Sequence, residues 1–456
     1  MSQLDTPAAG RTVVYTPGVP NFDLEAVATW RDGEPGLDFY IGIPHASLIF
    51  LRAGDQFQAG YEAVLEIRDG EGKEVLGADD WSDDVVVSSY ETTQSFEPII
   101  VRRRMALDPG EYVIRAALQD ENGEKQAVRA VRVAVPSRQP EDVSMSGIRL
   151  EAKKGEMFEP QVAFHMPANL DSLRTIVELY NTPRDRDVEL SMTLIEFRTD
   201  TLIASAPYWV SPNVGSLAYR GVDYSRPDTL QSTRRQFTNL SDEVTVIFTL
   251  PPLRPGNYLI DIRAQLIDEP LASAGDVPAG PTIFLQRERE LSIKAPEFPR
   301  LTTLRQGVEA LTYIAYDREL KEMLSAETPE EMRRLFDEFW GGLISNKKVA
   351  ANIIKQYYGR IEEANQLFTT HKEGWKTDRG MVYILLGAPA YVETLMDAEV
   401  WHYSYSDRDP LNTFYFQRAR PYGANAIFNN YILARRAYYE RAWLRAVERW
   451  RSGAVL

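Results

Sequence analysis

The sequence predicts a mainly β chain with an α+β C-terminal part, and three observations lead to this prediction. Hydrophobic residues alternate with a period of two over residues 22–136 and again over residues 144–293. Helical spacing of apolar residues replaces that alternation after Pro299. The chain has 456 residues, which at roughly 150 residues per domain suffices for about three domains.

The first alternating segment contains short strands separated by strong turn signals. Residues 39–43 and 63–67 have the composition and alternation of β-strands. The Asp-Gly pair at 69–70 and the Asn-Gly pair at 122–123 predict hairpins, because tight hairpin turns require a positive φ. About seven or eight strands at this spacing indicate an immunoglobulin-like β-sandwich.

The second alternating segment repeats the first. Residues 253–260 match residues 107–114, and each stretch contains a Pro-Gly turn followed two residues later by a tyrosine, Tyr112 or Tyr258. Such a tyrosine can bond back to the turn, as in a tyrosine corner. The predicted organisation is a flexible tail (1–21), a first sandwich (22–138), a Pro-rich joint (136–142) and a second sandwich (144–296).

A helical region is predicted over residues 300–370. Apolar residues have helical spacing over 304–324 and again over 350–368. Between them, Thr328-Pro329-Glu330-Glu331 forms a capping box with proline at the first helical position, which predicts the start of another helix. Three such helices can bury a shared core, so we interpret their aromatic residues as core residues.

The last segment, residues 371–456, is predicted to combine strands with a C-terminal helix. The apolar run 381–386 lies between two glycines and predicts a buried strand. Residues 401–405 and 413–416 are its expected antiparallel neighbours.

The C-terminal helix is predicted over residues 431–450 and is rich in arginine. Six arginines occur within 17 residues, and helical spacing places Arg441, Arg445 and Arg449 on one face. In an acidic chain, a basic helix predicts docking onto the chain's own acidic surface or onto an acidic partner. A solvated helix face is the alternative.

Charge and composition exclude several classes of function. The chain has 51 basic and 66 acidic residues, and its net charge of -15 disfavours nucleic acid as a partner. It contains no cysteine, which excludes disulfides, thiolate metal sites and cysteine nucleophiles. Its four histidines are too widely separated in sequence for a local metal pair. We expect no cofactor and no metal.

The N-terminal residues leave two locations open. No apolar run reaches 18 residues, and residues 1–21 lack the basic and apolar regions of a signal peptide. The chain is therefore cytoplasmic, or it is an envelope protein shown without its leader. A small polar tail is typical of a chain that follows a removed leader or a lipid anchor, so membrane attachment is expected only through such an anchor.

A short motif near residue 375 carries a resemblance to a known family. Residues 374–380 read Gly-Trp-Lys-Thr-Asp-Arg-Gly, and Gly-Ala-Pro at 387–389 and Trp401 follow downstream. This pattern resembles the GWxTD-motif domain family, and the likeness extends over about residues 20–455. The resemblance implies an envelope-associated bacterial protein and a small α+β GWxTD domain. The motif residues that it carries over are Gly374, Trp375, Thr377, Asp378, Arg379, Gly380, Gly387, Pro389 and Trp401.

Two interpretations of the motif are possible. In the structural interpretation, which we favour, Asp378 accepts backbone N–H groups of the turn and Arg379 forms an ion pair. In the catalytic interpretation, His371, Asp378 and Arg379 line a small cleft. No serine or cysteine nucleophile occurs in a suitable context, so triad chemistry has no candidate.

The densest acidic run is Asp79-Asp80-Trp81-Ser82-Asp83-Asp84. Four carboxylates in six residues could hold calcium if a loop folds back, but the spacing of an EF-hand is missing. We favour a solvated loop. The 23 tyrosines and eight tryptophans also allow an aromatic platform that stacks on sugar rings.

The expected function is that of a non-catalytic structural or interaction subunit of a bacterial envelope or surface assembly. It would bind protein partners through sandwich faces, sheet edges and the GWxTD domain. The alternative is a glycan-binding or glycan-processing envelope protein. We expect a periplasmic or cell-surface location, with outer-membrane anchoring through a lipid, and cytoplasmic location as the alternative. The sequence does not indicate an oligomeric state.

Overall fold

The computed structural model describes residues 11–12, 19–31, 33–135, 144–168, 170–180, 187–208, 221–237, 243–267, 283–344, 346–395, 398–404, 412–418 and 430–455. The chain forms two compact units. Unit 1 contains Gly18–Phe197 and Ser225–Lys294, and unit 2 contains Arg198–Tyr224 and Ala295–Leu456. The predicted fold class, mainly β with an α+β C-terminal part, is confirmed. The predicted joint at 136–142 lies outside the described residues.

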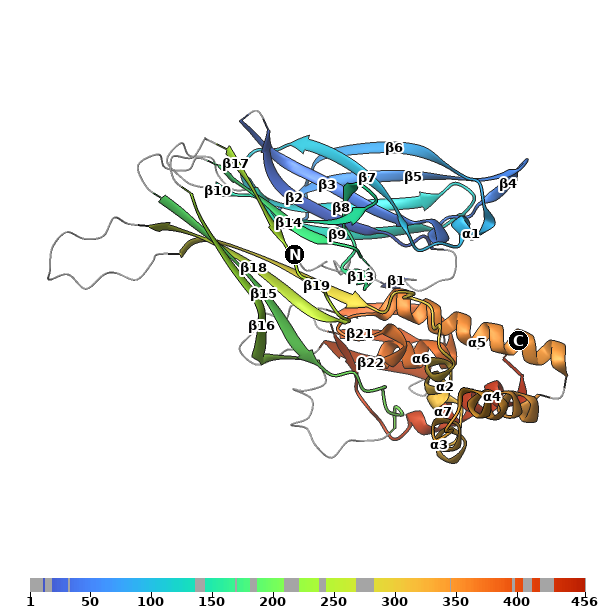
Figure 1. Cartoon of the computed structure of the whole chain (residues 1–456). Helices are drawn as coiled ribbons and strands as arrows, with labels where there is room; N and C mark the ends of the chain where they lie inside the picture. The colour runs from blue at the N-terminus through green and yellow to red at the C-terminus, as the bar shows by residue number, and fades with distance from the viewer. Residues whose placement is uncertain are drawn as a thin grey trace, which may run out of the picture. The chain divides into compact units, whose positions relative to one another are not determined.

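The first half of unit 1 is a sandwich of two antiparallel sheets (Figure 1). Side chains from both sheets form one buried core, which includes Leu24, Leu37, Ile67, Ile114 and Val131. One sheet contains β2 (Asp23–Arg31), β3 (Glu34–Pro44) and β7 (Pro98–Ala106). The other contains β4 (Leu51–Ala53), β5 (Gln56–Asp69), β6 (Val75–Val87), β8 (Gly110–Asp120) and β9 (Gln126–Val135). A short helix, α1 (Tyr90–Thr93), lies between β6 and β7.

The second half of unit 1 is a further two-sheet sandwich. Its core contains Leu150 and Val177 from one sheet and Leu190 and Ile262 from the other. The first sheet contains β10 (Ser144–Met145), β11 (Arg149–Lys154), β12 (Met157–Pro160), β14 (Leu173–Tyr180) and β17 (Glu243–Thr249). The second contains β13 (His165–Pro167), β15 (Asp187–Thr199), β16 (Val222–Phe237), β18 (Gly256–Ile267) and β19 (Ile283–Lys294).

The two sandwiches share the predicted tyrosine corner. The Tyr112 hydroxyl donates to the Asp108 carbonyl at 2.7 Å, and the Tyr258 hydroxyl donates to the Arg254 carbonyl at the same distance. A Cβ atom on Gly256 would lie 2.9 Å from the Tyr258 hydroxyl oxygen, so glycine lets the ring fold back over the turn. Burial raises the pKa of Tyr258 to about 12, so its hydroxyl stays a donor at neutral pH.

Buried polar contacts join the two sandwiches within unit 1. Arg289 of β19 forms an ion pair with Glu25 of β2, and its guanidinium also donates to the carbonyls of Ile148 and Gln161 at 2.9 and 2.7 Å. The rings of Trp30 and Tyr180 lie 4.5 Å apart. Because these contacts use both charge and aromatic packing, the tandem sandwiches form one structural body rather than two independent modules.

The acidic run at 79–84 is not a loop, and this prediction is wrong. It lies in the middle of β6, which pairs along its length with β5. Successive side chains of a strand point to opposite faces, so Asp79 and Asp83 are on one face while Asp80 and Asp84 are on the other. Calcium ligation by a folded-back loop is therefore not available here. Among the described strands, β6 pairs only with β5, and charges on such an edge disfavour the addition of a further strand.

Unit 2 contains helices and a small antiparallel sheet. The helices are α2 (Leu304–Ala310), α3 (Asp317–Leu324), α4 (Pro329–Leu343), α5 (Lys347–Phe368), α6 (Asp378–Leu386) and α7 (Tyr439–Ser452). The sheet has the order β1 (Arg11–Thr12), β20 (Tyr391–Leu395), β21 (Ala398–His402), β22 (Thr413–Arg418) and β23 (Tyr431–Leu433). One core connects helices and sheet, and it includes Tyr357, Trp375, Ile384, Trp401 and Trp450.

The helical region follows the predicted helices, with one difference. Thr328 caps α4 by accepting the N–H of Glu331 at 3.1 Å, with Pro329 in the first turn, as predicted. The reciprocal half of the predicted capping box differs, because the Glu331 carboxylate accepts the N–H of Glu327, one residue before the cap. The predicted helix over 304–324 is divided into α2 and α3 by a 3-10 turn. Thr303 and Gln306 form a capping box that starts α2, a signal that the sequence analysis missed.

The predicted strand at 381–386 is a helix, α6. Thr377 caps this helix, and Gly387, with a φ of 81°, ends it. All residues from Arg379 to Leu385 are buried, so the run shows no polar face. A short apolar run of this kind has the same composition in a buried strand and in a buried helix, and periodicity alone cannot separate the two.

The C-terminal helix begins later than predicted. Tyr431–Leu433 form strand β23, and α7 begins at Tyr439. Arg435 and Arg436 therefore precede the helix, whereas Arg441, Arg445 and Arg449 lie on it. Within the described ranges, no helix is long and apolar enough to cross a membrane.

Candidate functional site

The motif loop, residues 374–380, consists of a 3-10 turn at Gly374–Lys376 and the first turn of α6. Its two glycines are points of close backbone approach. A Cβ atom on Gly374 would lie 1.8 Å from the Ala364 carbonyl oxygen of α5, and one on Gly380 would lie 1.9 Å from the Gly374 carbonyl oxygen. No larger residue fits at either position, so these glycines set the distance between the motif loop and α5.

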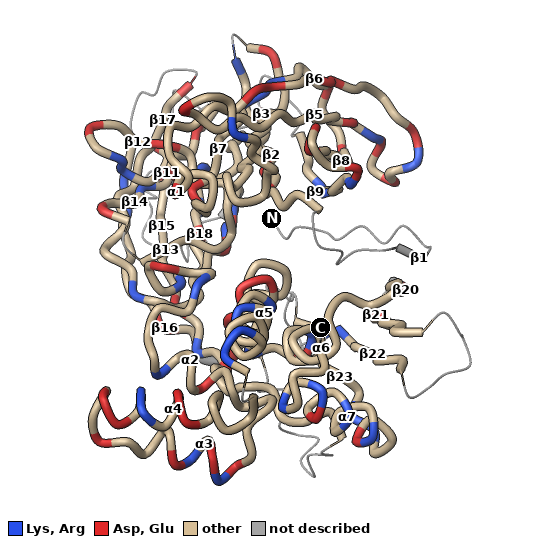
Figure 2. The backbone as a smooth tube through the Cα atoms, turned by 90° about the vertical axis from the view of Figure 1, so that its right-hand side faces the viewer, with Lys and Arg blue, Asp and Glu red and all other residues tan. Residues whose placement is uncertain are grey.

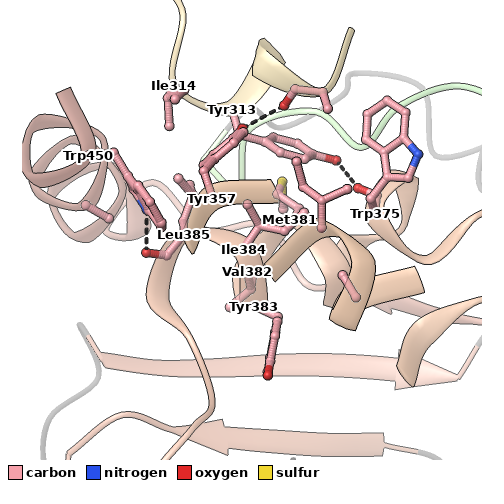
Figure 3. Close-up of a cluster of buried hydrophobic side chains, with 14 of the residues drawn as sticks. Tyr313, Ile314, Tyr357, Trp375, Met381, Val382, Tyr383, Ile384, Leu385 and Trp450 are labelled. Atoms are coloured by element: carbon pink, nitrogen blue, oxygen red, sulfur yellow. Dashed lines mark hydrogen bonds between the residues drawn. The ribbon is translucent and has the colours of Figure 1, made fainter. Parts of the chain in front are cut away.

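Trp375 is buried, and its backbone joins the motif loop to α5 and to the turn that contains Tyr313. Its N–H donates to the Asn365 side-chain oxygen of α5 at 3.1 Å, and its carbonyl accepts the Tyr313 hydroxyl at 2.6 Å (Figure 3). The Asn365 amide also donates to the Pro299 carbonyl at 2.7 Å. The motif tryptophan thus holds α5 and the Tyr313 turn together.

Two buried tyrosines beside the motif donate to backbone carbonyls. Tyr357 donates to the Ala310 carbonyl at 2.6 Å, and the Trp450 indole N–H donates to the Leu385 carbonyl at 3.1 Å (Figure 3). Burial raises the pKa of both Tyr313 and Tyr357 well above the ordinary value for tyrosine. Both hydroxyls therefore remain protonated, as their donor roles require.

Thr377 and Asp378 position α6 and the strand that follows. The Thr377 hydroxyl accepts the Gly380 N–H at 3.0 Å and donates to the Gly374 carbonyl at 2.7 Å. Asp378 forms a bidentate ion pair with Arg435, at 2.7 and 3.1 Å, and also accepts the Leu433 N–H of β23 at 2.8 Å. Asp378 thus accepts a backbone N–H from a distant strand, whereas the sequence predicted that it would accept N–H groups of its own turn.

Arg379 belongs to a separate buried cluster. Its guanidinium pairs with Glu399 of β21 at 3.2 Å, and the other carboxylate oxygen of Glu399 accepts the Trp401 indole N–H at 3.0 Å. The Arg379 guanidinium also lies 4.6 Å from the centre of the Tyr431 ring. Consecutive residues Asp378 and Arg379 thus fix two different strands against α6.

Residues 200–205 of unit 2 contact the motif loop and its neighbours. Lys372 forms an ion pair with Asp200 at 3.0 Å, and the Ala204 N–H donates to the Lys376 carbonyl at 3.0 Å. Arg435 also donates to the Ser205 carbonyl at 3.2 Å. These residues follow β15 in the sequence but belong to unit 2. The predicted second sandwich, residues 144–296, assigned them to the other unit.

The turn after α6 has a structural role as well. The Gly387 carbonyl accepts the Tyr403 hydroxyl at 2.8 Å, and Pro389 leads into β20.

His371 is buried, and its Nδ1 atom lies 3.3 Å from the Thr370 hydroxyl. The carboxylate of Asp378 and the guanidinium of Arg379 contact different partners, so each of these two charges of the catalytic interpretation is already paired.

The arginines of α7 have a different environment from those of the motif. Arg441, Arg445 and Arg449 are exposed, and within the described part of the chain none has an ion-pair partner. Leu444 on the same helix is 53% exposed, and Tyr438 just before it is 45% exposed. Figure 2 shows the basic residues along α7.

The partners of the motif were not predictable from local sequence. Arg435, Glu399 and Asn365 complete its contacts, but they lie 57, 20 and 10 residues from Asp378, Arg379 and Trp375 respectively. The available signal was the presence of Asn365 within an otherwise regular helix, where asparagine is unfavourable unless its side chain has a specific partner.

A family comparison supports the resemblance of the motif. Residues 284–452 match the GWxTD domain family. The chain carries a GWxTD domain. This match includes α2–α5 as well as the motif loop, so the helical region predicted over residues 300–370 belongs to the same family match as the motif segment that follows it.

Comparisons with curated proteins and with solved structures do not indicate a function for the chain. No curated protein matches the chain. Red sea bream transglutaminase matches with 9% identity and a TM-score of 0.18, over 60% of this chain and 31% of that chain. A Salmonella alpha-2-macroglobulin reacted with methylamine matches with 13% identity and a TM-score of 0.18, over 63% and 17%. The chain thus spans about a third or less of either protein.

The first sandwich has no exposed tryptophan at which a sugar ring could stack. Trp30 is buried at 3% exposure, and the Arg103 guanidinium covers the Trp81 ring at 4.7 Å. These are the two tryptophans of residues 22–138. Nothing in their geometry favours the glycan-binding alternative over protein binding.

Proposed function

We propose that this protein is a non-catalytic interaction subunit, which binds an acidic protein partner through helix α7 of its GWxTD domain. The observation that carries the proposal is the exposed face of Arg441, Arg445 and Arg449, whose charges lack partners within the described residues. An exposed cationic face beside Leu444 and Tyr438 combines charge complementarity with apolar contact area, as protein interfaces do.

The pairing of the motif side chains supports a non-catalytic role. Asp378 and Arg379 are both engaged in buried ion pairs, and a group that is tied in this way is poorly placed to move a proton or bind a substrate. The acidic edge of β6 further favours α7 over strand addition as the means of binding. The envelope location remains a proposal that rests on the family resemblance.

The proposal is tested by in-cell crosslinking and mass spectrometry with a charge-reversed variant. Arg441→Glu, Arg445→Glu and Arg449→Glu are combined, and crosslinks from α7 to an acidic partner are expected to disappear. The matched control combines Arg333→Glu, Lys347→Glu and Lys348→Glu, which reverse three exposed cations on α4 and α5. The control is expected to keep the crosslinks.

Two outcomes would contradict the proposal. One is a partner whose crosslinks survive charge reversal on α7 and are lost in the control variant. The other is substrate turnover by the purified chain that Asp378→Asn abolishes without any change in the thermal unfolding midpoint. Fractionation of the same cells, followed by detection of the chain in the envelope or cytoplasmic fraction, tests the proposed location.

A further inference from the structure

A groove of about 570 Å³ lies on the GWxTD domain where one face of α5 meets α6 and the turn that follows it. Its volume is within the usual range for small-ligand sites. Gly359 leaves the backbone of α5 uncovered, since a Cβ atom there would have no neighbour within 4 Å, while Arg360, Glu363 and Tyr383 supply the polar groups. In Figure 3, Tyr383 extends away from Tyr313 and Tyr357, on the other side of α6.

Arg360 has unused hydrogen-bond donors in this groove. Its Nη1 atom donates to the carbonyls of Ile384 and Leu385 at 3.1 and 3.4 Å, at the C-terminal end of α6. A guanidinium has five N–H groups, and within the described residues Nε and Nη2 of Arg360 have no acceptor and no carboxylate partner. Nη2 lies against Gly387, 3.1 Å from where a Cβ atom would be.

The groups around Arg360 restrict the chemistry of a ligand. Lys355, which precedes Arg360 on α5, is an exposed cation with no ion-pair partner in the described part of the chain. Glu363 accepts the Tyr383 hydroxyl at 2.8 Å and adds one negative charge to the groove. One carboxylate beside two cations leaves room for a single further negative charge, and a planar carboxylate matches the guanidinium fork.

Gln356 adds a second requirement. Its Oε1 atom is buried and has no hydrogen-bond partner among the described residues, and its side chain lines the same groove one turn from Arg360. A buried acceptor without a donor is costly, so a ligand that offers an N–H gains affinity once the half-buried Gln356 side chain turns its amide oxygen into the groove.

We propose that this groove binds an N-acyl α-amino acid, either free or as the last residue of a peptide. The α-carboxylate pairs with the free edge of Arg360 and with Lys355, and the neighbouring amide N–H donates to Gln356 Oε1. This proposal does not rest on partner binding by α7, because the residues that line the groove belong to α5, α6 and the turn after α6, and none of them belongs to α7.

The test is ligand-observed NMR on the full chain with N-acetyl-L-phenylalanine, its neutral carboxamide, and a hexapeptide ending in phenylalanine with a free or amidated C-terminus. The free acids are expected to bind at least about tenfold more tightly than the amides, since a charge-assisted pair contributes about that factor. If the small acid and the peptide bind equally, the free amino acid derivative is the relevant source. If only the peptide binds, the C-terminal residue of a peptide is the relevant source of the carboxylate.

Variants of α5 test the geometry. Arg360→Lys keeps the charge but loses the fork, and we expect at least about tenfold weaker binding of the acids. Lys355→Glu is expected to weaken binding as well, and Lys348→Glu, an exposed position of α5 outside the groove, is expected to leave it unchanged. Thermal unfolding confirms that each variant is folded. Equal binding of acids and amides, undetectable binding of every probe, or equal effects of Lys355→Glu and Lys348→Glu would overturn the proposal.

Discussion

The motif loop and the α5–α6 groove use arginine in opposite ways within one GWxTD domain. Arg435 and Arg379 are buried against Asp378 and Glu399, at 2.7 and 3.2 Å. Arg360 is likewise withdrawn from solvent, so that burial lowers its pKa, but its contacts are backbone carbonyls and the Trp450 ring.

This difference separates residues that stabilise the fold from residues that can bind a ligand. A buried charge with a full set of partners fixes the elements that carry it. A half-buried charge whose remaining donors have no acceptor among the described residues stays available to a ligand. The sequence motif therefore marks the structural side of the domain, and the candidate binding side lies outside the motif.

The largest effect is expected from Gly374→Ala. Its Cβ atom would overlap the Ala364 carbonyl oxygen at 1.8 Å, and backbone on both sides leaves no room to shift. We expect a loss of about 4 kcal/mol in the free energy of unfolding, or a chain that does not fold, measured by urea denaturation.

Gly341→Ala is the matched control for this change. Gly341 lies in α4, a Cβ atom added to it would have no neighbouring atom within 4 Å, and alanine is the better helix former by about 1 kcal/mol. A stable Gly374→Ala variant, with unfolding like that of Gly341→Ala, would show that the motif loop does not depend on close backbone approach.

A direct comparison of the two kinds of arginine gives the second prediction. Arg435→Met leaves Asp378 buried without its cation, and we expect a loss of about 3 kcal/mol in unfolding free energy. Arg360→Met removes hydrogen bonds to two carbonyls and no ion pair, so we expect about 1 kcal/mol. Both values come from urea denaturation at neutral pH.

A double-mutant cycle makes this comparison sharper. Asp378→Asn combined with Arg435→Met should be less destabilising than the sum of the single changes, because each single variant leaves one buried charge unpaired and the double variant leaves none. Additive losses of unfolding free energy in the cycle, or equal losses for Arg435→Met and Arg360→Met, would contradict the claim that Arg435 stabilises the fold more than Arg360 does.

Much of the fold follows from local sequence patterns. The repeated Pro-Gly-x-Tyr corner and the Thr328 cap each act over a few residues, so a single stretch of sequence contains the whole signal. The Asp-Gly and Asn-Gly pairs lie at the β5–β6 and β8–β9 hairpins, but the positive φ expected there is found at Gly72 and not at Gly70 or Gly123. The tyrosine corners in particular are confirmed at both Tyr112 and Tyr258.

The candidate sites depend on contacts between distant residues and were less predictable. The run 381–386 was predicted as a strand because burial removes the polar face that marks a helix. The acidic run 79–84 was assigned to a loop, although strand pairing with β5 decides its structure. The groove was missed entirely, because Gln356 and Arg360 match an ordinary helix surface until Gly387 is brought beside them.

A smaller effect is expected from removing single hydroxyl groups near the motif. Tyr313→Phe removes the donor to the Trp375 carbonyl and leaves that acceptor buried, so we expect a loss of about 1 kcal/mol in unfolding free energy. Tyr403→Phe, which removes the donor to the Gly387 carbonyl beside the groove, is the comparison. If neither change alters the free energy of unfolding, these tyrosine hydroxyls do not stabilise the motif loop or the turn beside the groove.

The smallest effect concerns an ion pair at the rim of the domain. Arg451 of α7 contacts Glu319 of α3 at 2.7 Å and holds the pKa of that carboxyl below its ordinary value of 4.5. A lowered pKa in the folded state means that the pair stabilises the protein above about pH 4.5 and that this contribution is lost as the pH falls. Glu319→Gln should therefore lose less stability than the wild type on acidification, by under about 1 kcal/mol because the pair is partly solvated. In an Arg451→Met background, the same substitution should alter the pH profile of unfolding less, because only the Tyr316 N–H, which donates to Glu319 at 2.8 Å, still lowers the pKa of that carboxyl. An undiminished difference would show that Arg451 contributes nothing to the effect.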